Sequence, residues 1–326
     1  MSIGANAFLL SNSVLAKWLL EDYPFRIQLA PIFPFIPIAG HELRYATTPF
    51  LPPAFAIDAC APIPEDTKNP IDPNRVFRMA ELATHYRICY SAQDIFSSNV
   101  NDQAAVQAAL AIRELLYKFF TLMEAGDSVN PGEFDGLLKI VDPLKVVDLN
   151  CTAVTLEKLS ETINRVRSND GRAVVGFGPN VMKRAIEVAH WKRGLSPEYE
   201  EMEFPNPRGG IRRQKVLIFD GAPFYVIDLF QSRPCVIPPP GPPLPPAAEL
   251  TSNGTDVVGN AWFAVLGEGH LHAITPAALG TRLFATRDTR LPDGSTDIYH
   301  MTMPVGLALG SACSLAVLKN GKIPQP

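Results

Sequence analysis

The strongest periodic pattern in the chain predicts one long helix over residues 101–126, NDQAAVQAALAIRELLYKFFTLMEAG. Apolar side chains recur there at steps of three and four residues, the spacing of one helix face: Val106, Ala109, Ile112, Leu116, Phe119, Phe120 and Met123. Asn101 or Asp102 can cap the first turn, and Gly126 is predicted to end the helix in the left-handed conformation. At 1.5 Å per residue the helix would span roughly 37 Å. It is therefore either an ordinary core helix or the backbone of a flat, extended subunit.

The segment before residue 40 has the pattern of an apolar arm. Residues 6–20 predict a short amphipathic helix. It is followed by QLAPIFPFIPIAG, where Pro31, Pro34 and Pro37 fall every third residue and force an extended or polyproline path. Such an arm has little to bury against within its own chain, so we expect it to lie across a neighbouring subunit. Packing along its own domain is the alternative.

A long hairpin is predicted next. Residues 41–48 predict one strand, and residues 75–91 predict its partner because Tyr86, Ile88 and Tyr90 alternate with other residues. Between the two strands lies a polar, proline-rich tip, PIPEDTKNPIDPN. An excursion of about 45 residues without a helix is unusual in a compact domain and generally has a functional cause.

Helices and strands then intermix, which predicts a compact α/β or α+β unit. Asp220 and Gly221 form a predicted tight turn between two of the strands. The predicted elements are a strand at 144–150, a helix at 155–168, a strand at 173–177, a helix at 179–193, and strands at 215–219 and 223–227.

The last third of the chain changes character at a proline-rich stretch. Residues 234–246, PCVIPPPGPPLPP, hold eight prolines and predict a stiff surface insertion. Docking of this stretch into an aromatic groove of a partner is the alternative. From residue 260 onward the pattern is all β, in the stretches NAWFAVLGE, HLHAIT, TRLFATR, DIYHMTM and CSLAVLK.

Composition narrows the class of protein. The 326 residues are enough for two compact units, and 47% hydrophobic with 19% charged residues suit a large core or large interfaces. A net charge of −4 and a pI of about 5.9 argue against a dedicated nucleic-acid binder. The five cysteines form no C-x-x-C pair and are predicted to be reduced, mostly buried thiols in a cytosolic setting. No secretory signal is evident, and residues 301–318 read as sheet rather than as a membrane span.

Two stretches resemble ligand sites but lack essential parts. G-F-G at 176–178 follows a predicted strand and opens a helix, yet Val181 stands at the third glycine position of the dinucleotide fingerprint. His270 and His272 lie on one predicted strand, and His300 could approach them, which would suit zinc. No acidic residue is placed to orient these imidazoles. We therefore predict no catalytic residue, no cofactor and no metal site.

One basic cluster stands out in the sequence, formed by Arg208, Arg212, Arg213 and Lys215. It is interpreted as a solvated loop. The alternative is a contact with an acidic patch on a neighbouring subunit.

The order of these elements resembles one known family. An N-terminal arm, a long hairpin, a long spine helix, an α/β middle and a β-rich C-terminus form the order of tailed-phage (Caudoviricetes) major capsid proteins of the Hong Kong 97 type. Four stretches of the local sequence are also similar to that family. Residues 44–66 and 75–91 resemble its extended loop, residues 156–189 its axial domain, residues 219–230 its strand–turn–strand with a G-x-P core, and residues 260–275 its return strand.

The resemblance implies an α+β fold with a mixed axial sheet flanked by helices. It divides the chain into an N-terminal arm (1–40), an extended loop (41–90), a peripheral domain (91–148) with spine helix 101–126, an axial domain (149–273) with the insertion 234–246, and a β-rich return to the peripheral domain (274–326). It further implies interface ion pairs, with Glu65, Asp66, Lys68, Arg208, Arg212 and Arg213 as candidates. Some relatives cross-link through a loop lysine, but Lys68 is interpreted as a solvated or ion-paired charge.

The function implied by the resemblance is structural and not enzymatic. Such a subunit self-assembles into pentamers and hexamers of an icosahedral shell in the virion, around double-stranded DNA held without sequence-specific contacts. Assembly would occur in the host cytoplasm and without a membrane. The expected partners are other copies, a portal and a decoration or cement protein. Many members of the family begin with a scaffolding segment that is cleaved during maturation, whereas here Met1 leads almost directly into the arm, so we expect a separate scaffolding protein or none.

Two alternatives remain open. An encapsulin-like nanocompartment would use the same fold to enclose a cargo enzyme in place of DNA. A cytosolic α/β nucleotide-dependent enzyme would use the turn at 176–181, but it would need a convergent set of ionisable groups that the sequence does not offer.

Overall fold

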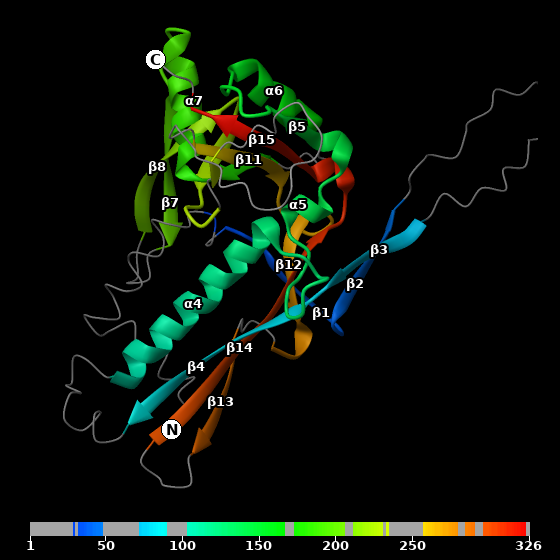
Figure 1. Cartoon of the computed structure of the whole chain (residues 1–326), viewed down its shortest axis with the longest axis vertical. Coiled ribbons are helices and arrows are strands. Elements are labelled where there is room, and N and C mark those ends of the chain that lie inside the picture. The colour runs from blue at the N-terminus through cyan, green and yellow to red at the C-terminus, as the bar shows by residue number, and fades with distance from the viewer. Residues whose placement is uncertain are drawn as a thin grey trace, which may run out of the picture.

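The computed structural model describes residues 29, 32–47, 72–89, 103–166, 173–205, 211–230, 233–234, 257–279, 284–290 and 296–323. These residues form two units, each built on one sheet, and a separate two-stranded hairpin. Figure 1 shows a lower unit crossed diagonally by the longest helix, an upper unit of sheet and helices, and the hairpin projecting to the right. The architecture is therefore α+β, as predicted.

The lower unit is a five-stranded sheet covered by the long helix α4 (Gln103–Ala125). Alternation along one strand explains its faces, since Leu82 and Tyr86 are buried while Glu81 and His85 are exposed. Both β4 and β14 pack against α4. The strand order is β1 (Phe35–Ile38), β12 (Leu271–Pro276), β14 (Thr296–Leu309) and β13 (Ala285–Arg290), with β4 (Ala80–Cys89) also paired to β14.

The predicted spine helix is confirmed, but its buried face is only half as predicted. In the C-terminal half the expected residues are fully buried: Phe119, Phe120 and Met123. Among the described side chains that precede Phe119 in the helix, the buried ones are Ala108, Ala111 and Leu115. Ile112 and Leu116, predicted on the buried face, are only partly buried. The small alanines face the sheet there, so the bulkier side chains lie at the margin of the contact.

Gly126 does not adopt the predicted left-handed conformation, because it is absent from the residues with positive φ. The glycine is required for a close approach instead. A Cβ atom at Gly126 would lie 2.4 Å from the carbonyl oxygen of Phe134 and 2.7 Å from that of Leu122. The returning loop crosses the helix end at this point, and the Gly136 amide donates to the Gly126 carbonyl at 2.8 Å.

The upper unit is an eight-stranded mixed sheet with helices α6 (Leu156–Arg165) and α7 (Asn180–Lys192). Two short helices, α5 (Leu137–Ile140) and η2 (Pro143–Lys145), lead into it from α4. Two further 3-10 turns are η3 (Ala277–Leu279) and η4 (Ala312–Ser314). The strand order is β5 (Val146–Asp148), β15 (Leu315–Lys322), β11 (Val257–Val265), β6 (Val174–Gly178), β9 (Ala222–Val226), β8 (Ile211–Phe219) and β7 (Glu198–Pro205), with β10 (Arg233–Pro234) paired to β11.

Most of the predicted middle elements are confirmed. The Asp220-Gly221 turn joins β8 to β9, and its φ angles of 52° and 74° are those of a tight hairpin turn. Strand β7 was not predicted, because its sequence EYEEMEFP is too acidic to resemble a strand. It lies at the end of the sheet order and pairs with β8, where most of its side chains remain in solvent.

Two hydrophobic clusters hold the fold together. The larger one contains Phe119 of α4 and Trp262 of β11, so it runs continuously from the lower unit to one face of the upper sheet. The second contains Leu159 of α6, Met182 of α7 and Phe263 of β11, so it fills the space between the other face and the helices. The two units therefore share one core.

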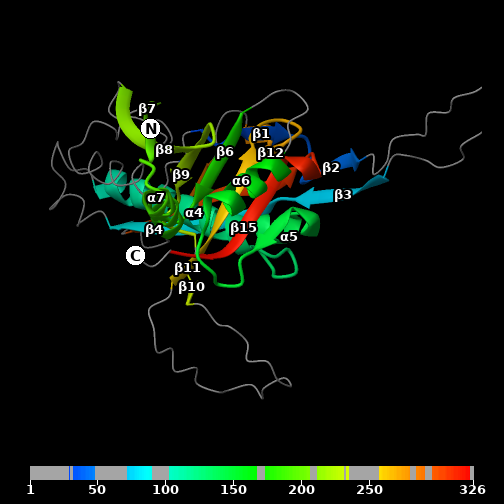
Figure 2. The same cartoon turned by 90° about the horizontal axis from the view of Figure 1, so that it is seen from above.

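The predicted hairpin is present, but its returning strand is divided. Strand β2 (Glu42–Thr47) pairs antiparallel with β3 (Asp72–Arg78). The chain then passes Met79 and continues as β4, which pairs with β14 over its whole length. The prediction of one partner strand over 75–91 is therefore wrong, since the lower sheet offers β4 a longer partner. In the view from above, β2 and β3 extend away from the body (Figure 2).

The described part of the N-terminal arm packs on its own chain. Leu29 and Phe33 are buried, and β1 runs parallel to β12. The ring centroids of Phe35 and Phe119 lie 5.7 Å apart. The expectation of an arm across a neighbour is therefore wrong for residues 32–38, because α4 and β12 provide an apolar surface within the chain. The predicted helix at 6–20 lies outside the described residues.

Two expectations about cysteines and membranes can be compared with the structure. Cys151 is disulfide-bonded, so the prediction of a reduced thiol is wrong for this residue. Cys313 is free, as predicted, but it is exposed and not buried. The partner of Cys151 is not among the described side chains.

None of the described helices has the length and apolar character needed to cross a membrane. Residues 301–318 are sheet, with a single 3-10 turn, as predicted.

Candidate assembly surfaces

The base of the hairpin carries a small cluster of charges. Arg44 contacts Glu42 through its Nη2 atom at 2.5 Å, and Arg78 approaches the same carboxylate at 3.9 Å. The hydrogen bond from Arg44 lowers the pKa of Glu42. Exposed pairs of this kind contribute little to stability, so their main effect is to orient the side chains on the hairpin.

Three large apolar side chains are exposed on the upper unit where α7 leads into β7. They are Trp191, Leu195 and Tyr199, whose exposed fractions are 59%, 52% and 42%. The Tyr199 hydroxyl donates to the Glu187 carboxylate at 2.7 Å, which holds that ring in place. Burial, together with Glu187, raises the pKa of Tyr199 to about 12. We call these three residues, which lie within nine positions of one another in the sequence, the tip patch, and we treat them as a candidate interaction surface.

The basic cluster predicted from the sequence falls only partly within the described residues. Arg213 stands on β8 and contacts Glu203 of β7 at 3.2 Å, within its own chain. Arg212 is placed by its backbone, which pairs with Phe204. Arg208, and the loop residues Glu65, Asp66 and Lys68, lie outside the described residues. All six remain predicted interface residues.

A loop closed by ion pairs and hydrogen bonds follows α4, and the sequence analysis did not single it out. Lys139 lies at its centre and contacts Asp127 at 2.5 Å and Asp135 at 2.7 Å. The Ser128 amide donates to Asp135 at 2.9 Å. At the apex of this loop the Val129 side chain is 82% exposed. The network holds an apolar side chain in solvent, as an assembly contact would require.

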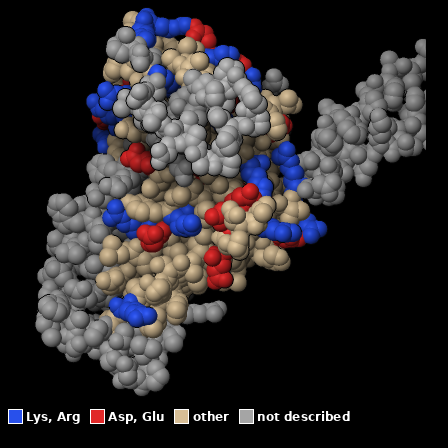
Figure 3. Space-filling view, in the orientation of Figure 1, with Lys and Arg blue, Asp and Glu red and all other residues tan. Residues whose placement is uncertain are grey.

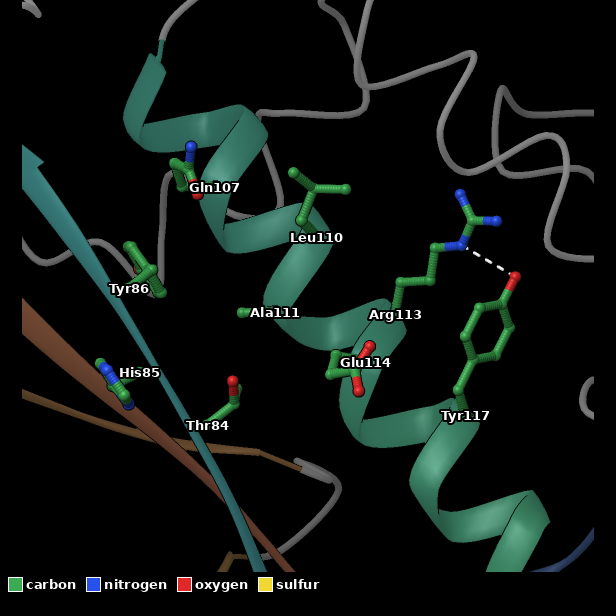
Figure 4. Close-up of a pocket in the computed structure, with 9 residues that line it drawn as sticks. All are labelled: Thr84, His85, Tyr86, Gln107, Leu110, Ala111, Arg113, Glu114 and Tyr117. Atoms are coloured by element: carbon green, nitrogen blue, oxygen red, sulfur yellow. Dashed lines mark hydrogen bonds between the residues drawn. The ribbon is translucent and has the colours of Figure 1, made fainter.

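A shallow groove of about 320 Å³ runs between α4 and β4. Figure 4 shows Thr84, His85 and Tyr86 on the strand side and Leu110 and Arg113 among the helix residues. Along the helix, Arg113 Nε donates to the Tyr117 hydroxyl at 2.8 Å. In the view of Figure 3 the surface over this part of the molecule is mostly uncharged, and charged side chains gather in a band across the middle and at the upper end.

The G-F-G stretch has a packing role and not the geometry of a phosphate site. Both glycines lie in β6, before α7 begins. A Cβ atom at Gly176 would lie 2.8 Å from the Phe224 ring, and one at Gly178 would lie 2.7 Å from the Asn260 carbonyl oxygen. The glycines therefore let neighbouring strands and rings approach β6.

The three histidines considered as metal ligands are not brought together. His270 Nδ1 lies 2.6 Å from the Ser314 hydroxyl, and His272 is fully buried beside it. His300 lies towards the other end of β14, where it pairs with His85 of β4. Within the described ranges no three His, Cys, Asp or Glu side chains form a group that could hold a metal ion.

Comparison with solved structures shows what class of fold this is. The holo-SrpI encapsulin complex of Synechococcus elongatus PCC 7942 superimposes with a TM-score of 0.66 at 17% identity, covering 91% of this chain and 88% of that chain. The capsid of a native GTA particle gives a TM-score of 0.63 at 10% identity, covering 90% and 89%. Mycobacterium phage Ogopogo gives a TM-score of 0.54 at 15% identity, covering 89% and 91%.

The chain thus has the capsid fold of the Hong Kong 97 type, as its order of elements predicts. The match runs over nearly the whole of each chain, and the matched structures include a GTA capsid, several phage structures and an encapsulin complex. No protein-family model matches the sequence, and no curated protein sequence matches it. The similarity of this chain to the matched structures is therefore a similarity of fold.

Proposed function

We propose that this chain is a structural shell subunit, the major capsid protein of a tailed bacteriophage. The observation that carries the proposal is the full-length capsid fold, with a hairpin that extends beyond the body of the molecule (Figures 1 and 2). An isolated two-stranded hairpin is marginally stable in water. It therefore favours an assembly in which neighbouring copies cover it.

Assembly into pentamers and hexamers of a closed icosahedral shell follows from this proposal. A shell needs several contact regions on each subunit, since each copy has several neighbours. The hairpin, the tip patch and the Val129 loop supply three such regions on different parts of the molecule. The loop residues Glu65, Asp66 and Lys68 and the arginines Arg208, Arg212 and Arg213 are proposed to add ion pairs between copies.

The packaged molecule in this proposal is double-stranded DNA. A net charge of −4 provides no positive electrostatic potential that would attract DNA to a binding site on the subunit. The DNA would therefore be held by containment and without sequence-specific contacts. The other proposed partners are a scaffolding protein, a portal and a decoration protein. The shell would be assembled in the host cytoplasm and remain as the virion capsid, with no enzymatic role for the subunit.

An encapsulin-like nanocompartment is the second candidate. The observation that favours it is the similarity to the SrpI encapsulin, with a TM-score of 0.66. In that case the lumen would hold a cargo protein in place of DNA. A nucleotide-dependent enzyme is not supported, because Gly176 and Gly178 are enclosed by side chains and backbone of their own sheet.

The two shell candidates differ in what native particles contain. Particles purified from the natural source are treated with nuclease, and the protected nucleic acid and the co-purifying proteins are identified. Protected double-stranded DNA of genome length supports the phage capsid. A nuclease-treated particle that holds one abundant enzyme and no DNA would overturn the capsid proposal in favour of the nanocompartment.

A further inference from the structure

Two histidines face each other across neighbouring strands of the lower sheet. His85 of β4 and His300 of β14 are directly opposite in the antiparallel register. Their ring centroids lie 6.3 Å apart, with the ring planes at 43°. In Figure 4 the His85 side chain lies on the side of β4 away from α4, whereas Thr84 lies on the helix side. The register therefore places two imidazoles side by side on the face of the sheet that α4 does not cover.

Both imidazoles are accessible and uncommitted. His85 and His300 are exposed, in contrast to His270 and His272, which are buried. Within the described part of the chain, neither exposed ring takes part in a hydrogen bond or an ion pair. A neutral imidazole has one ring nitrogen without a proton, and this nitrogen can bind a metal ion. Each of the two exposed rings therefore has a nitrogen available as a ligand.

The strands hold the two rings within reach of one ion. Residues directly opposite in an antiparallel pair have Cβ atoms about 4.5–5.5 Å apart, and Zn²⁺ binds imidazole nitrogens at about 2.0–2.1 Å. Rotation about the side-chain torsions can therefore bring both rings to a shared ion. The ladder between β4 and β14 is continuous over the whole of β4, so it fixes the spacing of the ligands. Once one imidazole has bound, the second binds intramolecularly, which strengthens the complex.

The neighbouring residues on this face favour one kind of ion. The next pairs along the ladder are Ala83 with Thr302 and Arg87 with Ile298. None of these four residues carries a carboxylate, and Mg²⁺ and Ca²⁺ bind mainly through oxygen ligands of that kind. Zinc and the neighbouring transition metals accept imidazole nitrogens. Arg87 is exposed, so its guanidinium group can extend into solvent away from the ion.

We propose that His85 and His300 form a two-histidine site for a divalent transition-metal ion such as Zn²⁺, with water in the remaining coordination positions. A bound ion would connect β4 to β14 outside the hydrophobic core. The sequence analysis grouped His300 with His270 and His272 and did not consider His85, because only the β4–β14 register brings His85 opposite His300. The inference concerns one subunit and does not depend on shell assembly or on what a shell contains.

Equilibrium dialysis of the full chain against Zn²⁺ tests the site and is suited to single subunits and assembled particles alike. His85→Gln and His300→Gln should each weaken binding of one zinc ion per chain by at least about tenfold, since the remaining imidazole has no second ligand beside it. The double variant should lose little more than either single variant, whereas two independent sites would lose binding additively. His41→Gln and Cys313→Ser remove other exposed ligands and should leave this ion in place.

Hydrogen–deuterium exchange of the native chain provides a second measurement that needs no variant. At a Zn²⁺ concentration ten times the Kd, openings that separate the two histidines should become about tenfold rarer, so exchange in β4 and β14 should slow. Peptides from β7 and β8, in the upper sheet, are the internal reference. Mg²⁺ at the same concentration should have no effect. Zinc binding that is unchanged in both His85→Gln and His300→Gln would overturn the proposal, as would equal exchange of β4 and β14 with and without Zn²⁺.

Discussion

Glu124, in the last turn of α4, accepts a hydrogen bond from Nδ2 of Asn260 in β11 at 2.9 Å. The contact joins the lower unit to the upper sheet across 136 residues of sequence. Asn260 Oδ1 in turn accepts from the backbone amide of Asn320 at 3.1 Å, and Asn320 Nδ2 donates to the Asp148 carboxylate at 3.0 Å. Because Glu124 is buried, it is tolerated only with such partners, and these partners fix the angle between the units.

Glu124→Ala should therefore destabilise the unassembled subunit. Loss of the carboxylate leaves the Asn260 amide without this acceptor, a cost of about 1–3 kcal/mol. Glu114→Ala is the matched control, because Glu114 is exposed on the same helix, and it should change stability by less than about 0.5 kcal/mol. Urea unfolding measures both. Equal midpoints for the two variants would contradict the role given to the Glu124–Asn260 contact.

Phe119→Ala should be the most damaging single change on α4. Its ring is fully buried and lies within 6.3 Å of Phe33, Phe35, Phe120 and Phe134, centroid to centroid. A cavity of this kind costs about 3–5 kcal/mol. It should also release β1 from the sheet, seen as faster amide exchange at residues 35–38. Leu110→Ala, on the exposed side of α4, should cost less than about 1 kcal/mol. A similar loss in both variants would refute the assigned core.

Gly126→Ala should destabilise the junction of α4 with the following loop. The added Cβ would meet two backbone carbonyl oxygens at 2.4 and 2.7 Å, and backbone cannot rotate away as a side chain would. We expect a loss above about 2 kcal/mol. Gly132→Ala serves for comparison, because the added Cβ would meet no atom within 4 Å. The loss of stability should then come only from placing alanine at a positive φ, which costs about 1 kcal/mol. The prediction fails if Gly132→Ala is the more harmful change.

Trp191→Ser should impair assembly without harming the fold. Trp191 is mostly exposed in the subunit, so its removal should change the free energy of unfolding by less than about 0.5 kcal/mol. If the tip patch contacts another copy, the concentration required for assembly should rise at least about tenfold. Light scattering over a concentration series measures this, with Lys192→Ser as the neighbouring control. Unchanged assembly of Trp191→Ser would exclude the tip patch as a major interface.

The loop around Lys139 should lose its order in acid. The hydrogen bond from Lys139 lowers the pKa of Asp127; burial raises that of Asp135, but Lys139 and Ser128 lower it on balance. The contribution of these carboxylates is therefore present above about pH 3.9 and is lost as pH falls through the lowered values. The NMR signal of the Ser128 amide reports it. Lys139→Met should shift the transition upward, while Lys158→Met, in a separate ion pair, should not. An identical titration in Lys139→Met would contradict the role given to the contacts of Lys139 with Asp127 and Asp135.

Much of the fold could be predicted because local patterns and tertiary packing agree. The long helix α4, the Asp220-Gly221 turn and the C-terminal strands were all predicted and are all observed, although the N-terminal half of α4 buries a different face. The predictions failed where the position of a strand depends on partners that are distant in the sequence. β4 leaves the hairpin because β14 offers a longer edge, and β1 joins β12 because α4 and β12 form an apolar surface beside it.

The candidate surfaces were harder to predict than the core. Glu124 sits among apolar residues in LMEAG, and only the position of Asn260 explains it. The tip patch and Val129 resemble core residues in the sequence, and their exposure is decided by which side of α7 and of the loop meets the sheet. Exposure is a property of the fold, so periodicity alone does not reveal it.

Electron microscopy of the purified chain, alone and with a candidate scaffolding protein, tests the proposed shell most directly. Closed shells, or rings of five and six subunits, are the expected result, because the capsid fold and three separate contact regions favour assembly around symmetry axes. A monodisperse monomer or dimer under every condition would contradict a shell role. The fold would then serve another function.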